Sequence, residues 1–112
     1  PEGTSTNGEK LLPFQSVHFQ SPLLAKSSIL PVAINYTKIN EEKANRGNRD
    51  KVCWYGQVEF YQHVLEALKL NGIEAKVKIY PKIDLTTDKS YSRKELSQAS
   101  YQIILESYPL FN

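Results

Sequence analysis

The chain has 112 residues, with 14 basic and 12 acidic side chains and a formal net charge of +2. A charge this small and this evenly mixed excludes a strongly basic nucleic-acid-binding surface, so we expect no nucleic-acid partner. A content of 40% hydrophobic and 23% charged residues excludes a disordered chain and is typical of one globular domain or part of one.

Three absences in the sequence narrow the interpretation further. No apolar run approaches the ~20 residues that a membrane-spanning helix needs. Cys53 is the only cysteine, so an intrachain disulfide is impossible. Methionine does not occur at all, and we therefore expect residues 1–112 to be a piece of a longer protein.

The first third of the chain predicts a loop, a broken helix and a strand. Residues 1–13 contain an Asn-Gly pair that begins at Asn7, which is a strong turn signal. Apolar residues at helical spacing in 14–26 predict two short helical pieces or a kink at Pro22. Residues 29–36 are almost all apolar or β-branched, which predicts a strand buried on both faces, as in a parallel sheet.

The middle third predicts a loop, a helix and a second strand. Residues 37–51 are rich in charged and turn-forming residues and predict a solvated surface loop; the alternative is a basic patch that faces anionic phospholipid headgroups. Residues 57–70 predict an amphipathic helix, which Gly72 would end in a left-handed conformation. Residues 73–79 alternate between apolar and polar, which predicts a strand with one solvated face near a sheet edge.

The last third predicts a polar connection over 81–91 followed by a helix. Ser92 and Glu95 have the spacing of a capping box, and the helix should end near Tyr108-Pro109. The alternation of helices and strands along the whole chain predicts an α/β fold with a mainly parallel or mixed sheet flanked by helices.

The first four residues, Pro1-Glu2-Gly3-Thr4, have the chemistry of an anion-binding loop. Gly3 lets the backbone approach an anion closely and turn its N–H groups toward it. The Thr4 hydroxyl adds a hydrogen-bond donor. Glu2 would accept hydrogen bonds from ligand hydroxyls or orient a neighbouring basic group, because a carboxylate repels phosphate. Taken alone, such a segment is more often an ordinary loop.

The same segment resembles the third sequence block of the glycerolipid acyltransferases, Phe-Pro-Glu-Gly-Thr-Arg-Ser, with residues 1–4 in register. Residues 29–34 are similar to the fourth block of that family, a hydrophobic stretch around Val-Pro-Val, at about the expected distance. Three further segments resemble the lyso-ornithine-lipid type of these enzymes, namely Asn7-Gly8, Leu12-Pro13-Phe14 and Trp54-Tyr55-Gly56.

The resemblance implies a truncated glycerol-3-phosphate acyltransferase-like fold, in which residues 1–112 are the C-terminal part of a single domain that lacks the upstream catalytic block. It implies transfer of a fatty acyl group from acyl-CoA or acyl carrier protein to the hydroxyl of a lysophospholipid or related lysolipid. The reaction would need no cofactor and would take place at the cytoplasmic face of the cell membrane. The acceptor contacts would come from Glu2, Gly3, Thr4 and Pro31.

The chain departs from the family pattern at two positions. The Arg that follows Thr in the third block is replaced by Ser5, and a basic residue of the following segment is replaced by Gln15. A phosphate would therefore need another cationic partner, such as Lys10 or a residue upstream. This departure favours a lysolipid acceptor other than simple lysophosphatidic acid.

Neither histidine fits the family's catalytic base, which is a His followed by four residues and an Asp. Leu23 stands at the Asp position after His18, and Leu68 stands there after His63. We expect His18 to be packed or half-exposed and His63 to lie at the surface or boundary of its helix. Residues 1–112 alone should therefore lack acyltransferase activity.

Other reactive groups predict no further site. Cys53 has no activating neighbour in the sequence, and we expect it to be buried beside Trp54. Asp84, Asp88 and Glu95 form a loose acidic group without a His or Cys at metal-ligand spacing, so we expect no metal site.

The main alternative function is a non-catalytic α/β module that binds a protein partner or a membrane surface, in which the Pro-Glu-Gly-Thr match is accidental. A small nucleic-acid-binding domain is disfavoured by the balanced charges. If the chain is a cut domain, the strand at 29–36 would lack neighbours. We would then expect exposed apolar surface and self-association.

Overall fold

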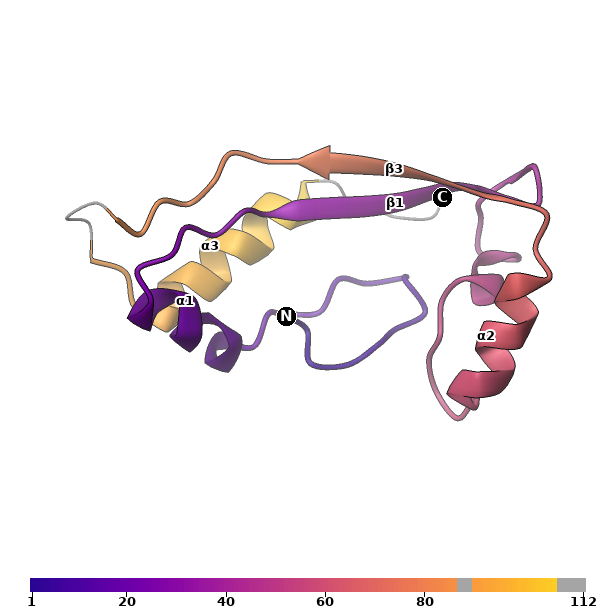
Figure 1. Cartoon of the computed structure of the whole chain (residues 1–112), viewed down its shortest axis with the longest axis horizontal. Helices are drawn as coiled ribbons and strands as arrows, with labels where there is room; N and C mark the ends of the chain where they lie inside the picture. The colour runs from indigo at the N-terminus through magenta and orange to yellow at the C-terminus, as the bar shows by residue number, and fades with distance from the viewer. Residues whose placement is uncertain (87–89, 107–112) are drawn as a thin grey trace. The chain divides into compact units, whose positions relative to one another are not determined.

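The computed structural model describes residues 1–86 and 90–106, and its helices and strands alternate as the sequence predicts. In chain order they are η1 (Ser16–Phe19), α1 (Gln20–Leu24), β1 (Val32–Ile39), β2 (Glu42–Lys43), η2 (Arg49–Lys51), α2 (Phe60–Leu68), β3 (Ile73–Ile79) and α3 (Arg93–Leu105), where η denotes a 3₁₀-helix (Figure 1). The fold class is α/β. The chain forms two compact units: the first contains residues 1–3, 12–33 and the described residues from 78 onward, and the second contains 4–11 and 34–77.

The three strands form one small antiparallel sheet in the order β2-β1-β3, so the expectation of a mainly parallel or mixed sheet is wrong (Figure 1). A two-residue turn reverses the chain after β1, with Asn40 at φ 53° and Glu41 at φ 68°. Ile39 pairs with Glu42 across this turn. Two consecutive positive φ values match the right-handed twist of a hairpin, and a hairpin makes its strands antiparallel.

Strand β1 begins three residues later than predicted and is not buried on both faces. Its burial alternates at the start, with Ala33 buried while Val32 and Ile34 are 41% and 52% exposed. An antiparallel sheet can leave one face uncovered, which a parallel sheet flanked by helices cannot. The long apolar run of the sequence therefore describes a strand with one covered face.

Strand β3 has the bounds that the sequence predicts and lies at the sheet edge, also as predicted. Both of its faces are exposed, however, so the prediction of a single solvated face is wrong. Its apolar residues Ile73, Val77 and Ile79 are 46%, 56% and 65% exposed. Among the described residues, nothing covers this apolar row.

The core of the first unit is built by α3 and the helical segment at 16–24, which lie side by side (Figure 1). Phe19, Leu85 and the fully buried Leu96 form its centre. The expected pair of short helical pieces is confirmed, although the chain passes from η1 to α1 before Pro22. The capping box that opens α3 is also confirmed, and its predicted end at 108–109 lies outside the described residues.

The core of the second unit surrounds Ile39 and Ala44, against which Tyr36, Val52, Cys53 and Leu70 pack. The predicted helix at 57–70 is present as the shorter α2. Gly72 does not end it, because its φ is not positive and Lys69 is the C-cap. The expected surface loop at 37–51 instead contains the end of β1, β2, η2 and the buried Arg49.

Candidate functional site

The segment Pro1–Gly3 is held by residues that follow it in the first unit. The backbone N–H of Gln15 donates to the Pro1 carbonyl at 2.8 Å, and the backbone N–H of Leu12 donates to Glu2 Oε1 at 2.8 Å. Gln15 Nε2 donates to the Glu2 carbonyl at 3.4 Å. One carboxylate oxygen of Glu2 thus ties the segment to Leu12.

Gly3 adopts φ +81°, and the side chain of Gln15 lies across it. Thr4 is exposed, and its hydroxyl makes a long 3.5 Å hydrogen bond to the Ser5 carbonyl, so this hydroxyl can exchange partners easily. The arrangement presents an exposed hydroxyl directly after a glycine in the left-handed region.

Substitution of the glycines at 3, 56 and 72 compares the cost of a side chain at positive φ with its cost at ordinary φ. A Cβ on Gly3 would lie 2.3 Å from Gln15 Nε2, whereas Gly56, at φ +69°, and Gly72 have nothing within 4 Å. We expect Gly3→Ala and Gly56→Ala each to destabilise the fold by about 1–2 kcal/mol, because an L-residue is strained at positive φ. Gly72→Ala should be nearly neutral in urea unfolding.

A second comparison separates strain from collision at Gly3. Adding Gln15→Ala to Gly3→Ala removes the colliding amide but leaves the positive φ. We therefore expect the double variant to stay less stable than Gln15→Ala alone. Equal stability of the two would show that the collision, and not the backbone, accounts for the cost.

Pro31 makes no hydrogen bond to the other predicted acceptor-binding residues among the described residues. It is buried, and its carbonyl accepts a hydrogen bond from the backbone N–H of Tyr80 at 3.0 Å. No hydrogen bond or ion pair among the described residues joins Pro31 to Glu2 or Gly3. Lys10, considered as a phosphate partner, is exposed.

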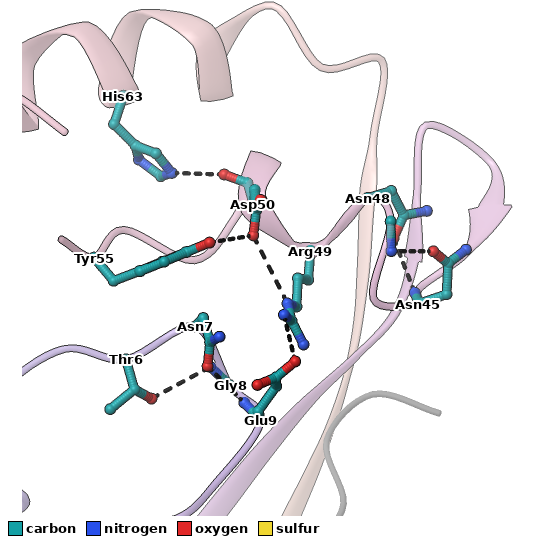
Figure 2. Close-up of polar contacts among 11 residues, drawn as sticks. Thr6, Asn7, Gly8, Glu9, Asn45, Asn48, Arg49, Asp50, Tyr55 and His63 are labelled. Carbon is teal, nitrogen blue, oxygen red and sulfur yellow. Dashed lines mark hydrogen bonds and ion pairs between the residues drawn. The ribbon is translucent and has the colours of Figure 1, made fainter. Parts of the chain in front are cut away.

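A polar cluster in the second unit was not predicted from the sequence. Its centre is Arg49, whose Nη2 donates to Glu9 Oε1 at 2.8 Å and whose Nε lies 3.7 Å from Asp50 Oδ1 (Figure 2). This contact lowers the pKa of Glu9 and raises that of Arg49, chiefly through their hydrogen bond. The two residues are 40 positions apart, so no local pattern could have joined them.

Tyr55 and His63 approach Asp50 from the other side of the cluster (Figure 2). The Tyr55 hydroxyl donates to Asp50 Oδ1 at 2.9 Å, which raises the pKa of Tyr55. His63 Nε2 lies 3.3 Å from the backbone carbonyl of Asp50, not from its carboxylate. The imidazole therefore has no carboxylate to orient it as a general base in the described residues.

The remaining reactive groups occupy ordinary positions. His18 is exposed, so the expectation that it is packed or half-exposed is wrong, whereas His63 is half-buried at the boundary of α2, as predicted. Cys53 is half-buried and not fully buried as expected, and this burial raises the pKa of its thiol, which is the opposite of an activated nucleophile.

Asp84 belongs to the loose acidic group formed in the sequence by Asp84, Asp88 and Glu95. Its carboxylate accepts hydrogen bonds from the Thr86 hydroxyl at 2.6 Å and the Thr86 backbone N–H at 2.9 Å, and Lys82 Nζ lies 3.5 Å away. Glu95 is engaged in the α3 cap, and Asp88 lies outside the described residues. Within 1–86 and 90–106, no three His, Cys, Asp or Glu side chains gather at metal-binding distance.

These bonds predict a specific acid sensitivity. The Thr86 hydroxyl, followed by the Thr86 N–H, lowers the pKa of Asp84 from 3.8 to about 2. Because the folded pKa is depressed, Asp84 contributes stability above its unfolded pKa and loses it as pH falls through the folded value. We expect the stability difference between the unmodified chain and Asp84→Asn to be constant above about pH 5 and to vanish between about pH 4 and 2. Urea unfolding across this pH range measures it, and a pH-independent difference would contradict it.

Comparisons with known proteins relate the chain to O-acyltransferases. It is 29% identical over 94 residues to a lyso-ornithine lipid O-acyltransferase of Brucella abortus (strain 2308), covering 78% of this chain. It is 30% identical over 106 residues to a lyso-ornithine lipid O-acyltransferase of Rhizobium meliloti (strain 1021), covering 88% of this chain. These matches confirm the acyltransferase resemblance: the chain is homologous to part of the lyso-ornithine lipid O-acyltransferases.

The same comparisons set the extent of the relationship. The chain spans 35% of the length of each of these two relatives. No family model matches the sequence, and no solved structure matches the fold. Among the described residues, no helix is both long and apolar enough to cross a membrane.

Proposed function

We propose that the protein containing this chain transfers a fatty acyl group from acyl-CoA or acyl carrier protein to the hydroxyl of a lysolipid. The observation that carries this proposal is the homology to two lyso-ornithine lipid O-acyltransferases over most of the chain. The left-handed glycine followed by an exposed hydroxyl at Gly3-Thr4 is consistent with a headgroup contact. The site of action would be the cytoplasmic face of the cell membrane, because the proposed acceptor is a membrane lipid.

The reaction itself is an acyl transfer between a thioester and an alcohol. The acceptor oxygen attacks the thioester carbonyl and loses its proton to a general base, and the thiol of the donor leaves as the ester forms. The base would be a His oriented by an Asp, which residues 1–112 do not supply. A His-four residues-Asp motif encoded before Pro1 is therefore part of the proposal.

This segment would contribute acceptor binding rather than proton transfer. The Thr4 hydroxyl would donate to an anionic oxygen of the headgroup, helped by backbone N–H groups freed by the turn at Gly3. Glu2 would hold the turn through Leu12 and offer its second carboxylate oxygen to a headgroup hydroxyl or amine. Pro31 would support the site from within the core, because it is buried.

The proposal is tested with the protein encoded by the complete reading frame. We expect it to acylate lyso-ornithine lipid in vesicles, with acyl-CoA and acyl carrier protein compared as donors. Thr4→Val should raise the KM for the lysolipid by about 10- to 100-fold, which corresponds to the loss of one hydrogen bond to a charged group. The KM for the acyl donor should not change.

Ser27→Ala is the control, since it removes an exposed hydroxyl that lies outside the predicted acceptor-binding segment. It should leave both KM values unchanged. If the complete protein binds lysolipid vesicles but transfers no acyl group from either donor, the chain is a binding module and the proposed function is wrong.

A further inference from the structure

The buried arginine of the second unit has no part in the function proposed above. The Arg49 side chain is only 10% exposed, which is unusual for a permanent cation. Its Nη1 has no hydrogen-bond partner among the described residues, and the 3.7 Å from Nε to Asp50 is too long for a hydrogen bond. Within 1–86 and 90–106, the guanidinium therefore has a single short charge-assisted bond, the one to Glu9.

The backbone around Arg49 fixes where this cation lies. Arg49 is the first residue of η2, and its carbonyl accepts the backbone N–H of Cys53 at 2.8 Å. The buried Asn48 side chain accepts from the Asn45 N–H at 2.9 Å and donates to the Lys43 carbonyl at 3.1 Å. The arginine is thus presented by a segment whose polar groups are already engaged.

The partner carboxylate belongs to the loop at 4–11, which starts with Thr4. The Thr6 hydroxyl accepts from the Gly8 N–H at 3.3 Å, and the Asn7 side chain accepts from the Glu9 N–H at 3.1 Å (Figure 2). These two turns give the loop its local shape. Neither of them attaches the loop to the rest of its unit, whereas the bond from Glu9 to Arg49 does.

We propose that Arg49, acting through Glu9, is a positioning residue that holds the loop at 4–11 so that the Thr4 hydroxyl stays in place for the lysolipid headgroup. This inference rests on the proposed function. It is physically reasonable because a misplacement of about 1 Å in a binding group can cost about 100-fold in rate. Lysine should not replace Arg49, since its ammonium is more strongly hydrated than a guanidinium and is therefore costlier to bury at a side chain that is 10% exposed.

The test uses amide hydrogen exchange and steady-state kinetics on the complete protein. Glu9→Gln removes the ion pair at Glu9, whose side chain is 41% exposed, so the substitution does not change a core residue. We expect exchange of the amides at 4–11 to become about tenfold faster in Glu9→Gln and Arg49→Lys, because their local opening is less costly. The KM for the lysolipid should rise, while the KM for the acyl donor stays unchanged.

Glu66→Gln makes the same chemical change in the exposed ion pair with Lys69 and should alter neither measurement. Exchange at 4–11 that is unchanged in Glu9→Gln would overturn the inference. The outcome for the proposed function is separate. Faster exchange at 4–11 in a protein that transfers no acyl group would leave Arg49 as an anchor of the loop and reject its role in acyl transfer.

Discussion

Replacing Leu96 with alanine should destabilise the chain by about 2–5 kcal/mol, the largest effect that we expect from a single substitution. Leu96 is fully buried and lies in the centre of the first unit beside Phe19 and Leu85. The shortened side chain leaves a cavity. Neither α3 nor the 16–24 segment can move in to fill it, because each is held by other contacts. Phe14, for example, stacks on Phe19 with ring centroids 6.4 Å apart and accepts a hydrogen bond from Ser97 through its carbonyl at 2.6 Å.

Leu24→Ala is the matched control, because it is the same chemical change in the same unit at a side chain that is 76% exposed. We expect this variant to lie within about 0.5 kcal/mol of the unmodified chain. Thermal unfolding followed by circular dichroism measures both, and the difference in midpoint should exceed about 10 °C. Equal midpoints would show that Leu96 does not hold the core of the first unit.

Local sequence signals predicted the elements whose structure depends on neighbours in the chain. The alternation at 73–79 gave the bounds of β3, because side chains two apart share a face of a strand. Ser92 and Glu95 form the capping box, with the Glu95 N–H donating to Ser92 Oγ at 3.2 Å. Asn7-Gly8 forms the expected turn, with Gly8 at φ 73°. In each case all the interacting atoms lie within a few residues.

Strand direction could not be predicted in this way, because the residues at the chain reversal are not those that usually mark a hairpin turn. The chain reverses at Asn40-Glu41, and a glutamate at positive φ is not the residue that marks a two-residue hairpin. Without that turn, the apolar run at 29–36 was interpreted as a strand between helices. Which apolar side chains of β1 are covered depends on its pairing with β2 and β3, and that pairing is not visible in the local sequence.

The candidate site was predictable only in its first part. Residues 1–4 could be singled out because their types and order match a known block; that they bind the acceptor stays a prediction, and the comparisons support only the acyltransferase resemblance of the chain. The Arg49–Glu9 contact could not, since it joins a segment that reads as a charged surface loop to a turn 40 positions away. An ion pair between distant segments forms when the chain folds, and it leaves no periodic pattern in the sequence.

Residues 1–112 alone should show no acyl transfer to lyso-ornithine lipid from either acyl-CoA or acyl carrier protein, in contrast to the activity that we propose for the complete protein. The reason is chemical: His18 is exposed and followed at the Asp position by Leu23, and the ring of His63 faces a backbone carbonyl. Among the residues that the structure describes, neither imidazole has the oriented carboxylate that a general base for an alcohol uses, and Cys53 has a raised pKa.

Two variants of the complete protein test the same reasoning from the other direction. His18→Ala and His63→Gln should keep kcat within about twofold, because neither histidine is expected to act as the general base. Loss of a general base would lower the rate by about 10²–10⁴-fold, so the measurement distinguishes the two cases. Gln at position 63 can still donate toward the Asp50 carbonyl, so the boundary of α2 is preserved. A drop of 100-fold or more in either variant, or measurable turnover by residues 1–112, would place the base inside this chain. The His-Asp pair that we propose before Pro1 would then not be the base, and residues 1–112 would carry out both acceptor binding and proton transfer.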